Sequence, residues 1–302
     1  MVDRGGEVGD EQLLHPVFVD VAMLAGFVAQ LAGPQAEGGW APAGLDSMLE
    51  ALGQGAWANG TPLPVMAAPV QHYLASGLLG ELRRHLLEAG RVRVLRSAPD
   101  LVSVEPGDLV EVAGTCVGNP FEDLLGFYGS VIPKILDQEA TRAALLEQLR
   151  ARAKVVPKGR TTGPAAGAVD ELIEEMSEGG TDEVAARMIL DLVGDIARSP
   201  VRDVVVDAGD HAAVLTLATR LAMPDTLVTL RSSHVRALGK VTRVVATDGV
   251  IDLAARTGLG MLGGQLTTDL VESARTGPYE VAFADPVVGA PAVQIVPLAI
   301  TI

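Results

Sequence analysis

The stretch TGLGMLGGQL at residues 257–266 constrains the fold most, because it matches the dinucleotide-binding pattern G-x-G-x-x-G at Gly258, Gly260 and Gly263. A dinucleotide cradle needs a parallel strand that runs directly into the first glycine, followed by a helix whose first amides face the pyrophosphate. Here residues 255–257 separate the preceding strand from Gly258, and too few residues follow to complete a doubly wound sheet. We therefore interpret the glycines as packing positions that let a helix lie close against a sheet.

The strand and turn pattern predicts an α+β fold with mainly antiparallel sheets and helices packed on them. Strands are expected at 203–207 and 212–219, and a tight-turn signal, Thr247-Asp248-Gly249, predicts that 234–246 and 249–254 form an antiparallel hairpin. A sheet joined in this way differs from the parallel sheet of a nucleotide-binding fold, which supports the packing interpretation of the glycines.

Two further signals concern the middle and the end of the chain. The turn Glu105-Pro106-Gly107-Asp108 predicts a hairpin between strands 101–104 and 109–117, with a positive φ at its glycine. The final run VQIVPLAITI is apolar and β-branched, which predicts a buried strand, and Pro297 within it indicates an edge or a bulge.

Helical spacing from Val21 to Leu31 follows Asp20, whose carboxylate can cap the first free amides of a helix. The segment VVPKGRTTGPAAGA is the best linker signal in the chain. We therefore expect two α+β lobes: residues 1–154, with a disordered tail at 1–14, and residues 169–302, joined by a linker at 155–168.

Composition restricts the function classes. Hydrophobic residues make up 48% of the 302-residue chain, enough for a substantial core, and the formal net charge is -15. A field of that sign repels phosphate backbones and anionic lipids, so we expect neither a nucleic-acid partner nor a membrane. The acidic N-terminus does not resemble a signal peptide, and the single cysteine, Cys116, excludes an intrachain disulfide. We expect a soluble, cytoplasmic protein without a cofactor.

Two groups of residues are candidate sites. Lys240 interrupts an apolar strand that begins at His234, and these two residues with the three glycines could hold a nucleotide-like anion. Lys240 could equally emerge from the sheet or guard a strand edge. Asp207, Asp210 and His211 combine carboxylates and an imidazole that could bind a divalent metal. The alternative for these three is a polar turn in which an aspartate caps a backbone amide, and we favour it.

Several segments resemble, in order and spacing, a family of uncharacterised bacterial proteins defined as a domain of unknown function. They are VFVDVAMLAGFVAQLAG, GDLVEVAGTCVGNPFEDLL, VRALGKVTRVV and GAPAVQIVPLAITI. The resemblance implies an intracellular α+β protein without established catalytic residues, and it suggests a connection with conflict or defence loci.

The main functional hypothesis is a non-catalytic scaffold that binds a protein partner or forms a homo-oligomer. It depends on the absence of a convergent catalytic set and on the apolar terminal strand, which could seek a partner edge. The alternative is an enzyme or binding protein that uses Lys240 and Gly258–Gly263 to hold a nucleotide or another anion.

Overall fold

The computed structural model describes most of the chain and divides it into two compact units. The described residues are 15–32, 68–155, 183–222, 226–255 and 286–302, together with Thr268 and Glu272. The first unit contains residues 1–119, 199–253 and 286–302, and the second contains 120–198 and 254–285. The predicted linker lies, except for its first residue, outside the described residues, so its role as a lobe boundary stays a prediction.

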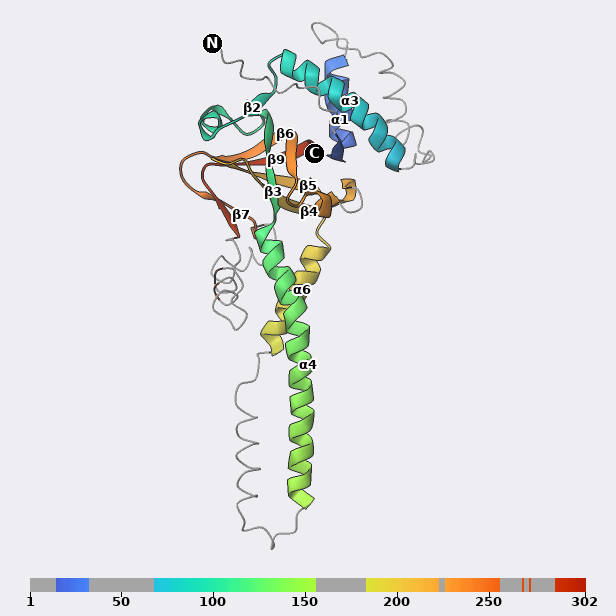
Figure 1. Ribbon diagram of the computed structural model, residues 1–302, viewed down its shortest axis with the longest axis vertical. Coiled ribbons are helices and arrows are strands. Elements are labelled where there is room, and N and C mark those ends of the chain that lie inside the picture. Colours follow the sequence, from blue (N-terminus) through green and yellow to red (C-terminus); the bar gives the residue numbers. More distant parts are fainter. Residues whose placement is uncertain are drawn as a thin grey trace, which may run out of the picture. The chain divides into compact units, whose positions relative to one another are not determined.

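Seven strands of the first unit form one sheet (Figure 1). Its members are β1 (Pro16–Val19), β2 (Arg93–Leu95), β3 (Leu109–Gly118), β4 (Val201–Asp207), β5 (Ala212–Ala218), β6 (His234–Val245) and β9 (Ala292–Thr301). Five strands close into a ring, because β4, β5, β9 and β6 follow β3 by successive pairing and β6 pairs β3 again. The remaining two strands extend the ring: β1 pairs β9, and β2 pairs β3.

The closed ring is a small barrel and confirms the α+β class. Most of its pairings are antiparallel, but β2 with β3 and β5 with β9 are parallel. The sheet is therefore mixed, with parallel pairings that the turn signals in the sequence did not predict.

Alternation along each strand fills the barrel interior with apolar side chains. On β3, Val110, Val112 and Cys116 are buried, whereas Ala113 and Thr115 are exposed, as the two-residue period of a strand requires. The interior cluster also contains Phe18, Leu101, Val204, Val206, Ala213, Leu215, Leu217, Leu230, Val235, Ala237, Val241, Val293, Ile295 and Ile300.

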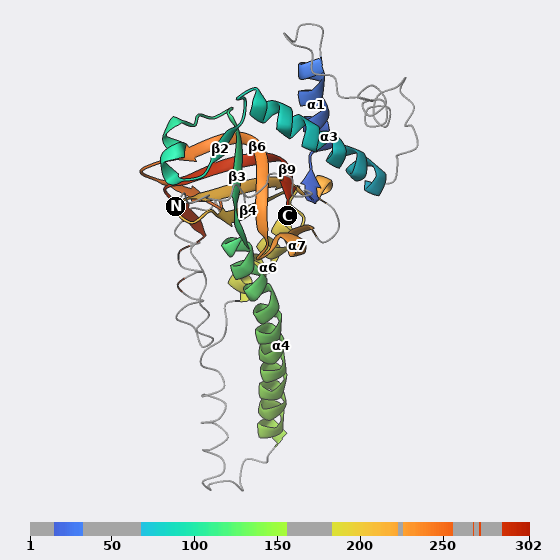
Figure 2. The same cartoon turned by 45° about the horizontal axis from the view of Figure 1, so that its top comes forward.

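Two helices cover part of the outer face of this sheet, α1 (Val21–Ala32) and α3 (Ala68–Glu88) (Figure 2). Leu238 of β6 and Leu298 of β9 point outward into a second apolar cluster that these helices complete. The predicted cap is confirmed, because the Asp20 carboxylate accepts a hydrogen bond from the Met23 amide at 2.9 Å. Among the described helices, none has the length and apolar character needed to cross a bilayer.

Two sequence predictions about pairing are wrong. Residues 101–103 of the predicted strand 101–104 belong instead to the 3-10 helix η1 (Ala98–Ser103), so no hairpin precedes β3. Gly107 does adopt the expected positive φ, at 103°. The second error concerns β7 (Val250–Asp252), which pairs β8 (Val287–Gly289) and not β6. In each case the turn signal in the sequence identified the bend correctly. It did not identify which strand pairs with the neighbouring strand.

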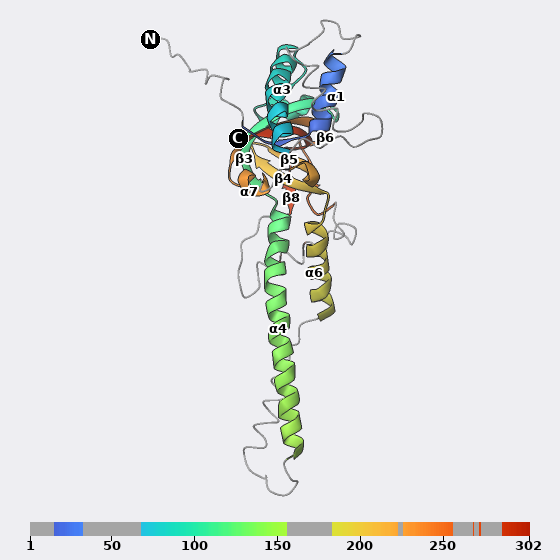
Figure 3. The ribbon, with the colours of Figure 1, turned by 90° about the vertical axis from the view of Figure 1, so that its right-hand side faces the viewer.

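The remaining described elements of the first unit are short. They are η2 (Thr219–Leu221) and α7 (Thr226–Leu230), which precede β6. The second unit contains α4 (Pro120–Val155) and α6 (Glu183–Ala197), which lie alongside each other (Figure 3). Gly129 allows close packing there, because a Cβ atom at this position would lie 3.1 Å from Val193.

The prediction of an irregularity at Pro297 is confirmed, because the register between β6 and β9 shifts at Leu238 and Gly239. Gly239 lies opposite Pro297, and the two backbones approach closely. A Cβ atom on Gly239 would lie 2.5 Å from the Val296 carbonyl oxygen and 2.6 Å from Pro297 Cα. No side chain fits between these strands at this point.

Gly239→Ala should therefore destabilise the protein by about 1–3 kcal/mol, because the barrel must open locally to admit one methyl group. The matched control is Gly77→Ala in α3, where an added Cβ meets nothing within 4 Å. The control should be stabilising by roughly 0.5–1 kcal/mol, since alanine favours a helix interior. Urea unfolding of both variants checks this; equal effects would contradict the close-approach argument.

Candidate functional site

The turn between β4 and β5 brings the predicted cluster Asp207, Asp210 and His211 to one end of the barrel. Asp207 Oδ1 accepts a hydrogen bond from the Gly209 amide at 2.8 Å, and Gly209 has a φ of 96°. The Ala208 amide donates to the His211 carbonyl at 3.0 Å, which closes the turn. Aspartate and glycine at these positions provide the short side-chain acceptor and the positive φ that such a turn requires.

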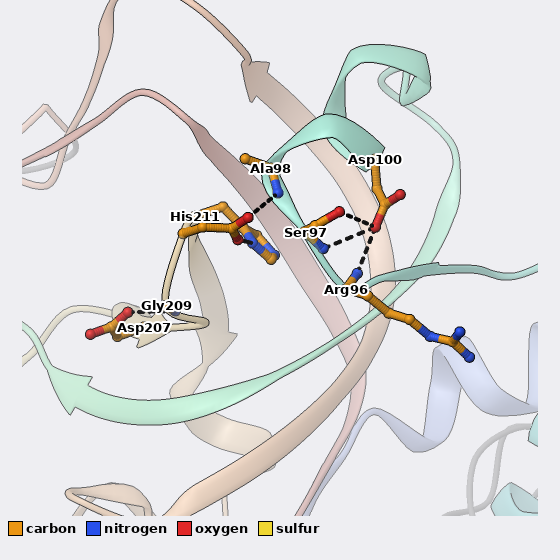
Figure 4. Close-up of polar contacts among 8 residues, drawn as sticks. Arg96, Ser97, Ala98, Asp100, Asp207, Gly209 and His211 are labelled. Atoms are coloured by element: carbon orange, nitrogen blue, oxygen red, sulfur yellow. Dashed lines mark hydrogen bonds and ion pairs between the residues drawn. The ribbon is translucent and has the colours of Figure 1, made fainter. Parts of the chain in front are cut away.

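A chain of hydrogen bonds leads from His211 to η1 (Figure 4). His211 Nδ1 lies 2.7 Å from Asp210 Oδ1, and Asp210 Oδ2 accepts from the Ala98 amide at 3.0 Å. The bond from His211, and then the one from Ala98, holds the pKa of the Asp210 carboxyl below its ordinary value. The carboxylate thus connects the turn to a helix that lies 112 residues earlier in the chain.

The start of η1 is fixed by a second carboxylate, that of Asp100. Its Oδ2 accepts from the amides of Arg96 and Ser97 at 2.8 and 2.9 Å and from the Ser97 hydroxyl at 3.2 Å. These amide bonds, from Arg96 first, lower the pKa of Asp100. Because Leu101 of η1 lies in the barrel core, the two carboxylates hold a cover over this end of the barrel.

The imidazole of His211 has only 1% of its side-chain surface exposed, and its Nε2 has no hydrogen-bond partner among the described residues. An unpaired buried polar atom costs about 1–3 kcal/mol. A histidine oriented by an aspartate is typical of a general base, but a base needs a nucleophile at its second nitrogen. No described hydroxyl or thiol bonds Nε2, and the contacts of the pair join the β4–β5 turn to η1.

The metal prediction finds no supporting geometry. Figure 4 shows the Asp207 carboxylate directed at Gly209, away from the His211 ring. Across the described part of the chain, no group of three or more His, Cys, Asp or Glu side chains is arranged to hold a metal ion. The turn interpretation accounts for the contacts of Asp207, Asp210 and His211.

Only two of the five residues predicted to bind an anion are among the described residues. His234 and Lys240 lie on β6 with exposed side chains, whereas Gly258, Gly260 and Gly263 are outside the described residues. At Lys240, β6 pairs both Leu109 of β3 and Val296 of β9, so Lys240 is not at a strand edge. Its side chain emerges from a central strand, and anion binding there stays a prediction.

Sequence reasoning missed a buried ionic contact between α3 and the barrel. Arg83 Nε lies 2.5 Å from Glu111 Oε2, and Arg83 Nη2 lies 2.9 Å from Oε1, with side-chain exposures of 13% and 5%. Arg236 of β6 approaches the same carboxylate at 3.7 Å. The only local signal was a glutamate within the apolar run LVEVAGTCV.

Glu111→Gln should destabilise the protein by about 3–5 kcal/mol, because it leaves Arg83 without its buried counter-charge. Replacing both partners, as in Glu111→Leu with Arg83→Met, should restore most of this loss. Glu81→Gln, which removes an exposed pair with Arg84, serves as the control and should change stability by less than about 0.5 kcal/mol. Chemical denaturation measures all three, and a double variant as unstable as Glu111→Gln would contradict this account.

The carboxylates of Asp100 and Asp210 should make the free energy of unfolding depend on pH in the acidic range. Both pKa values are lowered from 3.8, so their contribution is fully present above that value and is lost as the pH falls through the lowered pKa. The free-energy difference between the wild type and an Asp100→Asn, Asp210→Asn variant should stay constant from neutral pH to about pH 5 and shrink below about pH 4. Denaturant titrations at several pH values measure it, and a difference that grows in acid would refute the assignment.

A family model described as a domain of unknown function (DUF6414) matches residues 66–301. No curated protein and no solved structure matches the chain. The matched range includes α3, the turn between β4 and β5, η1 and all the strands except β1. The resemblance to a domain of unknown function is therefore confirmed over these residues, and the chain belongs to the DUF6414 family.

Proposed function

We propose that the protein is a non-catalytic module that binds a protein partner or a second copy of itself. The observation that carries the proposal is the filled barrel, whose interior is occupied by Val, Leu, Ile, Ala, Phe and Cys side chains. The interior of a small barrel is just wide enough for side chains to fill. The protein then acts through its outer surface.

The polar groups of the described residues support the same conclusion. The carboxylates of Asp210, Asp100 and Glu111 each bond a backbone amide or an arginine that fixes another element. Catalytic carboxylates instead converge on a substrate position, with a nucleophile or a base within reach. Each of these three groups holds structure, which supports a non-catalytic role.

We propose a different partner-binding surface from the terminal strand that the sequence suggested. The terminal strand β9 pairs β6 along one side and β5 and β1 along the other, so it offers no edge to a partner. Exposed apolar side chains remain as the binding surface. The larger ones are Val102, Val117, Leu227, Val228, Val250, Val287 and Ile302.

We place this activity in the cytoplasm. Cys116 is a free thiol buried in the barrel core, where it packs as a small apolar residue. A chain with a single unpaired cysteine suits a reducing compartment. The net charge of -15 further favours proteins, and not nucleic acids or anionic lipids, as partners.

The test is the state of the full chain in solution. Size-exclusion chromatography with light scattering should give a molar mass above the 31.3 kDa of one chain, or chemical cross-linking in its native extract should recover a defined protein partner. If apolar contacts hold the complex together, the complex should persist when the salt concentration is raised, because salt screens interactions between charges. A strict monomer that cross-links to no protein would refute the proposal.

A further inference from the structure

Exposed apolar side chains gather at the end of the barrel where β3 and β9 finish and β6 begins. Val117 lies near the end of β3, Leu227 and Val228 lie on α7, and Ile302 follows β9. Val228 is 75% exposed. We call these four residues the α7 surface.

Hydrogen bonds hold the parts of this surface together. The Ser232 amide donates to the Cys116 carbonyl at 2.7 Å, and the Cys116 amide donates to the Ser233 carbonyl at 2.9 Å, which places the chain leaving α7 beside Val117. The Thr226 hydroxyl donates to the Val17 carbonyl of β1 at 3.1 Å. Because β1 pairs the end of β9, α7 is also connected to the strand that Ile302 follows.

The backbone of this connection is held in an unusual conformation. Ser232 has a φ of 63°, and it is the one non-glycine residue with a positive φ in the described part of the chain. Such a conformation is uncommon for residues with a Cβ atom and persists only when surrounding contacts fix it. The α7 surface is therefore built on a rigid support and needs little ordering when a partner binds.

Several described residues next to the α7 surface in the chain are basic, although the protein as a whole has a net charge of -15. Arg220 precedes α7, Arg231 follows it, and His234 begins β6; all three are exposed. Arg236 lies opposite Thr301, although it also approaches Glu111 at 3.7 Å. The described acids nearest to the end of β3 in the sheet or in the chain are Asp207, opposite Thr115, and Glu122 and Asp123 in the first turn of α4.

We propose that the α7 surface docks an acidic protein segment that carries apolar side chains. The apolar residues of the partner pack on Val228, Leu227 and Val117, and its carboxylates face Arg220 and Arg231. This complementarity sets the encounter rate and orientation, while the apolar contacts provide the affinity. A nucleic acid fits less well, because none of the four residues is aromatic and the net charge of -15 repels phosphates. The inference rests on the proposed function and names its surface and partner chemistry.

The experiment measures binding of the full chain to a fluorescein-labelled peptide of glutamate and leucine, with a lysine–leucine peptide and a single-stranded oligonucleotide for comparison. The acidic peptide should bind more tightly than both others. Val228→Asp and Arg220→Glu should each weaken its binding by about tenfold or more. The effect of Arg220→Glu should diminish as salt is raised.

Two controls match these variants in exposure and chemistry. Val102→Asp changes an equally exposed valine, also 75% exposed, on η1, and Arg243→Glu reverses an exposed charge on the other part of β6. Both should leave binding unchanged, and all four variants should keep the wild-type thermal unfolding midpoint within a few degrees. If Val228→Asp unfolds the protein, Arg220→Glu alone decides the outcome.

The experiments distinguish a failure of the α7 assignment from a failure of the proposed binding function. Absence of peptide binding, equal loss in the controls, or tighter binding of the oligonucleotide would overturn the α7 assignment. If the wild type still oligomerises or cross-links to a partner under those outcomes, the binding function stands and another surface carries it. A third outcome is that the protein forms an oligomer, that Val228→Asp dissociates it, and that no peptide binds. The α7 surface would then be a contact between copies, and the acidic-segment proposal would be overturned.

Discussion

Closure of the barrel depends on β6, because this strand pairs β3 on one side and β9 on the other and so joins the two ends of the sheet. The joint is tight at Gly239, where the β9 backbone leaves no room for a Cβ atom. A register shift and Pro297 lie at the same place, so the strand bends where the ring must turn. The filled interior and the surfaces outside it all follow from this closure.

The outer face of the closed barrel has a part that α1 and α3 cover and a part that they leave exposed. The pair formed by Arg83 and Glu111 fastens α3 over the first half of β3, where Glu111 is buried. Beyond that point Ala113, Thr115 and Val117 alternate outward and are exposed. The buried ion pair therefore lies where the covered part of β3 ends and its exposed part begins.

The sequence predicted those features that local chemistry decides. The capped helix after Asp20, the strands later seen as β4 and β5, and the bend at Pro297 each depend on neighbours within a few residues. The failures have a common cause in long-range contacts. Leu-Val-Ser-Val at 101–104 has the alternation of a strand, but Asp100 and the barrel core fold it into η1. Likewise, the bond from Ala98 to Asp210 spans 112 residues, and no spacing in the sequence could indicate it.

The side chains at the two ends of the barrel make different contacts, and this difference supports the proposal that the α7 surface binds a partner. At the η1 end, Asp100 and Asp210 hold the cover in place, and Val102 is a single exposed valine on η1, which is ordinary for a protein surface. At the other end, Leu227 and Val228 are adjacent and exposed on a short helix that hydrogen bonds fix rigidly to the sheet. Folding gains nothing from apolar side chains kept in water, and rigid support lowers the cost of binding. A surface with both properties is best explained by a partner that covers it.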